Sequence, residues 1–419
     1  MLTRFIPSLM ISALLLSTSL SSSFASGDPS KTEKEWTFLV FLNADNNLDR
    51  FGVGDVAEME EVGSSDQVNV VVQFDRSHAK PAKRLYIKKG GHDVLEDMGE
   101  IDMGDINVLQ DFFSWGVENY PAKKYALVVW NHGSGWNKFP GNTIFKGISY
   151  DDESGNHITT AQLLEGTQVM RELLGRKLDI LAFDACLMQM VEVSYAIKDN
   201  VEIMLASEDT EPGEGWAYKE SLSPVVANPT WSPEQVSTSI VDAYDTSYDG
   251  GSQGVSSTTQ SWVRASMTDQ LVTALDNLAL ELTGNFLSET KAALRSVQKF
   301  YYRANVDLIH LLTLLETNIS ASDSTAKASA LATITAAKSM ANQFVGHSKA
   351  HGRKQKNAKG TAIYFPRKGY SFSEKYTKLG FAKASQWDEM LQAYYDATKS
   401  QVKDLQSYYE AKRVAGNEL

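Results

Sequence analysis

The sequence is short of positive charge and lacks several familiar catalytic motifs. Its 40 Lys and Arg residues are outnumbered by 52 Asp and Glu residues, which gives a net charge of −12 at pH 7. A nucleic-acid surface needs clustered Lys and Arg, so no nucleic-acid partner is expected. The chain also contains no HExxH zinc helix and no P-loop, and its one GxSxG match, residues 250–254, lies in a Gly/Ser/Thr-rich stretch and not where a strand runs into a helix. These absences leave a smaller set of hydrolytic chemistries to consider.

Only one apolar run invites a membrane interpretation, and it lies at the start of the chain. Arg4 precedes the run Leu9 to Leu20, and Ser23-Phe24-Ala25 offers small residues at the two positions that signal peptidase reads. The run is short for spanning a bilayer. We therefore expect residues 1–25 to be a secretory signal that is cleaved after Ala25. The mature protein would then be secreted or periplasmic and would have no membrane partner; a membrane anchor is the alternative.

Cysteine is nearly absent, since Cys186 is the single one in 419 residues. It cannot form an internal disulfide, although exported proteins usually pair their cysteines. An odd cysteine in an exported chain indicates a reactive thiol. The alternative is an inert, buried side chain that behaves as a small hydrophobe. Composition alone leaves both interpretations open.

Short apolar runs rich in Val, Ile and aromatic residues recur along the chain. They cover residues 36–42, 68–74, 125–130, 178–183, 201–206 and 360–365. Such runs are typical of strands buried on both faces. Segments with helical spacing lie between them, including 55–62, 106–120 and 160–174. This alternation predicts an α/β fold with a mostly parallel, six-stranded sheet covered by helices on both faces.

Changes in polarity and in hydrophobic spacing divide the chain into further segments. Residues 26–35 are polar and are expected to form a flexible lead-in, and residues 36–225 would form the core. Long helical patterns then fill residues 226–350, which predicts a helical subdomain inserted before the last strand. Residues 351–419 would supply that strand and a helical tail.

Two predicted strands end in chemically reactive residues. One runs into Asn131-His132-Gly133, and the next runs into Asp184-Ala185-Cys186. Ligands of parallel sheets bind beyond the carboxyl ends of the strands, so His132 and Cys186 are expected near one another. A thiol needs a nearby imidazole to form a thiolate near neutral pH. Gly133 would let the backbone approach a substrate, and its N–H could stabilise an oxyanion. A non-catalytic binding domain remains the alternative at this point.

Three segments carry a resemblance to a known family. They are residues 36–48, Asn131-His-Gly-Ser-Gly-Trp136 and Phe183-Asp-Ala-Cys-Leu-Met188, and they are supported by 207–216 and by 306–308 with 363–366. Together they resemble the clostripain family of cysteine peptidases, in the family's order. The resemblance implies a caspase-like α/β/α sandwich and a Cys/His dyad. Cys186 would be the nucleophile, His132 its partner, and the N–H groups of Gly133 and Cys186 the oxyanion hole.

The resemblance also implies a substrate preference. Family members typically cleave proteins or peptides after Arg or Lys, which requires carboxylates in the first specificity pocket. Asp184 matches a family pocket position. A second acid would come from the loop 208–214, with Glu214 the leading candidate by its spacing from Cys186 and Asp209 behind it. The alternative is that this loop is a solvated charged face.

Activation and cofactors are further implications of the resemblance. Members are often made as zymogens and cut between His and Cys, and the loop containing Lys146-Gly147 offers a cleavage site. The chemistry itself requires no cofactor. Calcium is needed by some relatives, and the acidic stretches 150–153 and 242–249 could bind it, although neither has EF-hand spacing. We assign no calcium ligand from the sequence.

Two other functions remain open. A catalytically silent protein-binding module could use the same fold, although intact His132, Gly133 and Cys186 argue against it. A transpeptidase or ligase would use the same thioester but a different acceptor. The sequence does not distinguish water from an amine in that step.

Overall fold

The computed structural model describes residues 32–77, 80–136, 147–322, 324–369 and 372–416. The expected signal sequence and Lys146 lie outside these ranges. Residues 33–419 form one unit, and all that follows concerns this unit. Among the helices within the described ranges, none combines the length and apolarity needed to cross a bilayer.

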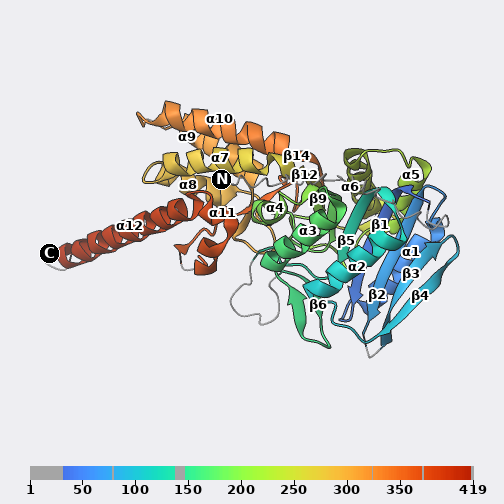
Figure 1. The fold of residues 1–419 in the computed structure, drawn as a ribbon. Helices are drawn as coiled ribbons and strands as arrows, with labels where there is room; N and C mark the ends of the chain where they lie inside the picture. Colours follow the sequence, from blue (N-terminus) through green and yellow to red (C-terminus); the bar gives the residue numbers. More distant parts are fainter. Residues whose placement is uncertain (1–31, 78–79, 137–146, 323, 370–371, 417–419) are drawn as a thin grey trace, which may run out of the picture. The chain divides into compact units, whose positions relative to one another are not determined.

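A nine-stranded sheet organises the chain, in the order β14-β12-β9-β8-β5-β1-β2-β3-β4 (Figure 1). Its five central strands are parallel: β9 (Val201–Ala206), β8 (Leu178–Asp184), β5 (Ala122–Trp130), β1 (Lys34–Ala44) and β2 (Val68–Arg76). Antiparallel strands complete both edges: β12 (Thr259–Arg264) and β14 (Val345–Ala350) at one, β3 (Lys80–Lys88) and β4 (Gly91–Gly99) at the other. The predicted α/β class with a mostly parallel sheet is confirmed.

The number of strands in the sheet differs from the prediction. Five predicted strands form the parallel centre, but the sixth, β15 (Ala362–Tyr364), pairs with β13 (Asn305–Asp307) in a separate two-stranded sheet. The four edge strands escaped prediction because they lack long apolar runs. In β4, for example, most side chains are exposed, since only one face of an edge hairpin packs on the protein.

Helices cover both faces of the sheet, as predicted. One face packs against α2 (Ile106–Asn119), α3 (Thr160–Leu174) and α4 (Val191–Ile197), through side chains that include Leu39 and Phe41 of β1. The other face packs against α1 (Asp49–Val62), α5 (Tyr218–Ala227) and α6 (Pro233–Tyr248), through Phe38 and Val40. The period-two alternation along a strand sends neighbouring residues into opposite cores.

The helices predicted after residue 226 are present. They are α7 (Thr268–Leu282), α8 (Leu287–Ser296), α9 (Leu308–Ser320) and α10 (Lys327–Phe344), and they gather in one group beside β12 and β14 (Figure 1, yellow to orange). The helix α12 (Trp387–Gly416) ends the described chain. The segment 226–350 also supplies α6 and two strands of the main sheet, so it contributes to the core layers as well as to this helical group.

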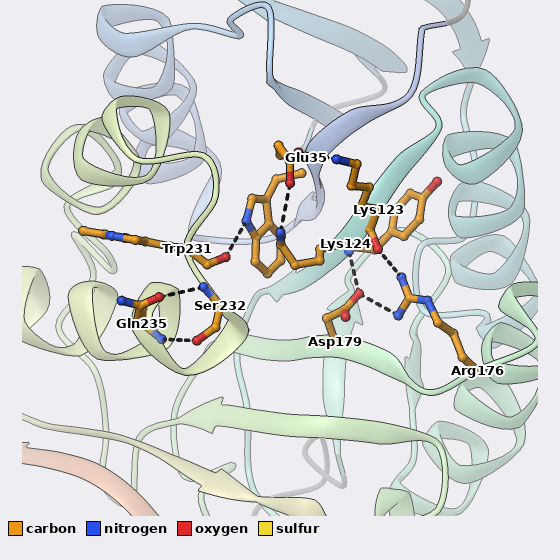
Figure 2. A network of polar contacts seen from close by, with 10 residues as sticks. Glu35, Lys123, Lys124, Arg176, Asp179, Trp231, Ser232 and Gln235 are labelled. Atoms are coloured by element: carbon orange, nitrogen blue, oxygen red, sulfur yellow. Dashed lines mark hydrogen bonds and ion pairs between the residues drawn. The ribbon is translucent and has the colours of Figure 1, made fainter.

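Polar contacts fix the amino-terminal ends of the central strands (Figure 2). Lys124 at the start of β5 pairs with Glu35 of β1 at 3.2 Å, and Arg176 pairs with Asp179 of β8 at 2.9 Å. Asp179 also accepts a hydrogen bond from the backbone N–H of Tyr125 (2.8 Å). These contacts lock the register of β1, β5 and β8, and therefore determine which residues emerge together at the opposite, carboxyl-terminal edge.

Candidate active site

The register of β5 and β8 brings the two reactive motifs together. Trp130 lies opposite Asp184, so His132 and Cys186 each follow the paired residues by two positions. The Asn131 N–H continues the pairing by donating to the Asp184 carbonyl at 3.2 Å. Both side chains line one cavity of about 340 Å³. The structure therefore places His132 and Cys186 together at the carboxyl edge of the sheet, where the sequence predicts them.

Gly133 packs directly on the backbone that carries the cysteine. A Cβ atom at position 133 would lie 2.3 Å from the carbonyl oxygen of Cys186, well inside contact distance. The adjacent bridge to β6 (Ile148–Asp151) uses the N–H of Ser134, which donates to the Gly147 carbonyl at 3.0 Å. Only glycine allows this approach of the two strand ends.

His132 is oriented by an asparagine from the end of β1. The Nε2 atom lies 2.7 Å from Oδ1 of Asn47. Because this amide oxygen can only accept, Nε2 carries the proton and Nδ1 is the basic nitrogen. Burial lowers the pKa of His132, and the charge of Asp152 opposes this shift. The imidazole is therefore neutral at neutral pH and able to accept a proton.

Cys186 is protonated in the same state. The backbone N–H of Glu211 donates to Sγ at 3.3 Å, and burial together with the Glu211 carboxyl raises the pKa of the thiol to about 12. A neutral thiol beside a neutral imidazole can exchange a proton only when something stabilises the resulting ion pair. Cys186 is thus a neutral thiol in this cavity.

Acidic side chains form the floor of the cavity. Asp184 is buried, and burial raises its pKa to about 7; its Oδ2 accepts from the Trp216 N–H at 3.2 Å. Glu211 also lines the cavity, its Oε2 is buried without a partner, and burial with the charge of Asp184 raises its pKa. Asp55 of α1 lies behind them, bonded to the Trp130 indole at 2.6 Å. Three acids with raised pKa values share this interior.

The two loop acids predicted for this pocket lie elsewhere. Glu214 is exposed and is not among the residues that line the cavity. Asp209 is buried outside it, where Oδ1 accepts from the Tyr301 N–H at 2.7 Å and Oδ2 accepts from Gln355. Spacing from Cys186 could not identify the inward acid, because the loop turns between Pro212 and Gly215. Glu211 is the loop acid that faces Asp184 in this structure.

The end of β1 is a functional element that the sequence did not explain. Asn131 donates to the Asn43 carbonyl (2.6 Å), and its Oδ1 accepts from the Tyr150 N–H (2.7 Å). Asn46 donates to the Tyr150 carbonyl (2.9 Å), while Asn47 holds His132. The available signal was a group of three asparagines directly after a buried strand. Their role is to join β1, β5 and β6 around the histidine.

A second group of acids offers ligands for a divalent cation. Oxygen atoms of Asp45, Glu100 and Glu153 lie within 4.8 Å of one another. Oxygens around Ca²⁺, at about 2.4 Å from the ion, are separated by at most about 4.8 Å. Asp75 is fully buried, its Oδ2 has no hydrogen-bond partner, and the charges of Glu100, Asp151 and Asp45 contribute to raising its pKa to about 8, after burial. These residues therefore fit calcium, and Glu153 belongs to the acidic stretch 150–153.

The other acidic stretch, 242–249, already has basic partners. Asp242 lies 2.8 Å from His347 and 3.6 Å from Lys349. Asp249 lies 3.6 Å from His351. Asp242 and Asp249 already have partners within the protein, so this stretch is a weaker candidate for a cation.

Of the expected activation site, only Gly147 is described. It is buried, has a φ of +145°, and donates from its N–H to Oγ of Ser134 at 2.9 Å. A Cβ at this position would lie 2.0 Å from the Ile158 carbonyl oxygen. Glycine is thus required where the chain enters β6.

Comparisons with known proteins agree with these features. The profile of the Clostripain family matches residues 40–394. Clostripain of Hathewaya histolytica is 26% identical over 277 residues, which are 54% of this chain and 53% of that protein, so the match spans about half the length of that relative.

Two solved structures share the fold. One is a secreted C11 cysteine protease from Bacteroides thetaiotaomicron in complex with an irreversible peptide inhibitor, with a TM-score of 0.64 and 23% identity over 84% of this chain and 99% of that chain. The other is an inactive zymogen C11 protease from Parabacteroides distasonis, with a TM-score of 0.64 and 19% identity over 84% and 98% of the two chains.

Proposed function

The chain belongs to the clostripain family of cysteine endopeptidases, and we propose that it hydrolyses peptide bonds after Arg or Lys, with Cys186 as nucleophile and His132 as its partner. The observation that carries this proposal is the single cavity in which both residues meet beside the buried Asp184 and the half-buried Glu211. Its substrates are proteins or peptides that present a basic side chain.

The proposed reaction uses these groups in turn. Nδ1 of His132 takes the thiol proton, and Sγ of Cys186 attacks the scissile carbonyl carbon. The N–H groups of Gly133 and Cys186 stabilise the resulting oxyanion. The imidazolium then protonates the leaving amine, which leaves a thioester. Water, deprotonated by His132, hydrolyses the thioester and regenerates the thiol.

The basic side chain of the substrate contributes to activating the nucleophile. The carboxyl groups of Glu211, Asp209 and Asp184 each raise the pKa of Cys186, after burial. A guanidinium or ammonium group placed against Asp184 and Glu211 compensates their charge. Thiolate formation then costs less free energy, so binding of the correct residue promotes ionisation of the thiol.

Three further features belong to the same proposal. The protein is exported through its first 25 residues, and one structural relative is described as secreted. It is activated by a cut at Lys146-Gly147. Calcium would be held by Asp45, Glu100 and Glu153, with the buried Asp75 close to them, and would neutralise their charge. Asp45 lies in the same turn as Asn47, which contacts His132, so this site would also support the histidine.

Matched fluorogenic peptides ending in Arg, Lys, Asp or Leu test the proposal. Mature protein, with and without calcium and before and after cutting at Lys146, is compared with Cys186→Ala. Cleavage after Arg or Lys that disappears in the variant is the expected result. Cleavage only after Asp or Leu would leave Cys186 as the nucleophile but contradict the assignment of an acidic specificity pocket. An added amine nucleophile that diverts most of the product into a new amide would favour the transpeptidase alternative.

A further inference from the structure

A second cavity adjoins the one that holds Cys186. It has a volume of about 660 Å³ and shares four lining residues with the first: Thr210, Glu211, Pro212 and Tyr301. Tyr301 is 67% exposed and stands where the two cavities meet. A peptide bound at Cys186 and continuing past this tyrosine would enter the second cavity. An extended peptide advances about 3.3 Å per residue, so the residues just before the cleaved bond are the ones that could reach a cavity adjoining the first.

Unpaired cations line this second cavity. Lys299, Arg303 and Lys354 border it, and in the described part of the chain none of the three forms an ion pair with an acid. Burial and the like charges of Arg303 and Arg367 lower the pKa of Lys299. In a protein with a net charge of −12, a group of cations that repel one another needs an explanation. An anionic ligand would relieve this repulsion.

A buried hydrogen-bond network fixes the segments that carry these cations. Asp209 accepts from the Tyr301 N–H at 2.7 Å and from the Gln355 amide. Gln298 donates to Oε1 of Gln355 at 3.1 Å and to the carbonyl of Lys354 at 2.9 Å. The loop after the nucleophile, the turn at Tyr301 and the turn at Lys354 are therefore tied to one another. Asp209 itself lines the second cavity, and both of its carboxyl oxygens accept hydrogen bonds within this network.

The position of this cavity indicates which part of a substrate it meets. It shares the loop 210–212 with the catalytic cavity but none of the segment that carries His132. Because His132 protonates the leaving amine, residues after the scissile bond extend past the histidine. The second cavity therefore lies on the acyl side.

We propose that this cavity is a subsite for an acidic side chain, Asp or Glu, at one of the residues just before the scissile bond. The inference rests on the proposed function and adds a second charge requirement to it. The preferred substrate then carries a basic residue at the cleaved bond and an acidic residue upstream. Substrate polarity matches the two cavities: acids beneath Cys186 and cations beyond Tyr301.

Tetrapeptide substrates ending in Arg, with Ala elsewhere or with one Asp at each upstream position in turn, test this subsite. We expect Asp at one of these positions to raise kcat/KM about three- to tenfold at low ionic strength, as partly exposed ion pairs do. The gain should shrink in about 0.5 M salt through screening. In the double variant Arg303→Gln, Lys354→Gln, the ratio of kcat/KM for the Asp peptide to that for the all-Ala peptide should be close to one. The variant Arg303→Glu should prefer a peptide with Lys at that upstream position over the peptide with Asp.

Lys356→Gln is the matched control, because Lys356 is exposed in the same turn but does not line the cavity. It should keep the full Asp preference. Cleavage of the all-Ala peptide in every variant reports the proposed function separately, since that peptide does not use the subsite. An Asp preference that is absent in the native protein, or unchanged in the double variant, would overturn the subsite while leaving the peptidase proposal standing.

Discussion

Replacing Glu211 by Gln tests the charge of the specificity pocket most directly. The side chain keeps its size and its hydrogen-bonding capacity but loses its charge, beside the buried Asp184. A hydrogen bond between charged groups in a protected site contributes about 1.5–3 kcal/mol, which corresponds to roughly a 10- to 150-fold change in kcat/KM. We expect this loss for a substrate ending in Arg.

Citrulline supplies the matched substrate, because it has the shape of Arg without the charge. The ratio of kcat/KM for Arg over citrulline should fall in Glu211→Gln, while the value for citrulline stays the same or rises, because loss of the Glu211 charge lowers the pKa of Cys186. Glu214→Gln is the control variant: the residue is exposed, so its removal should cost at most about 1 kcal/mol. A large loss in Glu214→Gln with none in Glu211→Gln would show that the loop rearranges and that our assignment of the acid is wrong.

The pH dependence provides a second test of the same pocket. Burial raises the pKa of Asp184 to about 7, so its carboxylate forms only as the pH rises through that value. In the free enzyme, kcat/KM for Arg peptides should therefore increase between about pH 6 and 8. The Arg to citrulline ratio isolates this step from the titration of the dyad. A ratio that stays constant over this range would refute it.

Three other perturbations follow from the geometry. Asn47→Ala removes the acceptor for Nε2 of His132 and should lower kcat/KM about tenfold. Asn47→Asp should raise the pKa of His132, so the acidic limb of the pH–rate profile should move to higher pH. An unchanged profile in both variants would contradict the assigned orientation of the histidine. Gly133→Ala should reduce kcat at least about 100-fold, because the new Cβ would lie 2.3 Å from the Cys186 carbonyl oxygen, while alkylation of the thiol reports that the protein is still folded. Calcium should raise the melting temperature, more at pH 8 than at pH 5, and Asp75→Asn should reduce the gain; equal melting curves with calcium and with a chelator at pH 8 would exclude the site.

The sign of that last dependence comes from the raised pKa values. Burial raises the pKa of Asp75 to about 8 and that of Asp45 to about 7, both above the ordinary value of 3.8. The folded state therefore holds more protons than the unfolded state between about pH 4 and 8. Without a cation, stability should fall as the pH rises through this window. A cation replaces the lost protons, which is why its effect should be larger at pH 8.

Patterns of apolar residues predicted the centre of the fold. Runs such as 68–74 and 201–206 are buried on both faces and lie within β2 and β9. Edge strands could not be found in this way. The strand β12 reads Thr-Gln-Ser-Trp-Val-Arg, and its buried Gln260 and Ser261 are tolerated because hydrogen bonds satisfy them. Polar satisfaction of this kind depends on partners that are distant in the sequence.

The site was predicted in part for the same reason. His132 and Cys186 were identifiable because each follows a buried strand, and strand direction determines where such residues emerge. The inward acid was not identifiable, since Asp209, Glu211 and Glu214 lie in one acidic loop and only its folded path decides which side chain faces Asp184. Asp55 was hidden for a further reason: it lies on a helix face where the pattern alone indicates an ordinary polar residue.

The pairing of β5 with β8 has a consequence for a chain that is cut between these two strands. The two strands hydrogen-bond side by side from Ala126 and Ile180 onward, and residues 137–146 belong to the chain that connects them. A polypeptide broken in that interval would still be held as two interlocked pieces, with β1, β2 and β5 in one and β8 and β9 in the other. The boundary between the pieces would run between His132 and Cys186, the proposed dyad. Neither fragment alone would contain a complete site, so separately produced halves should become active only on reassociation, as a split enzyme does.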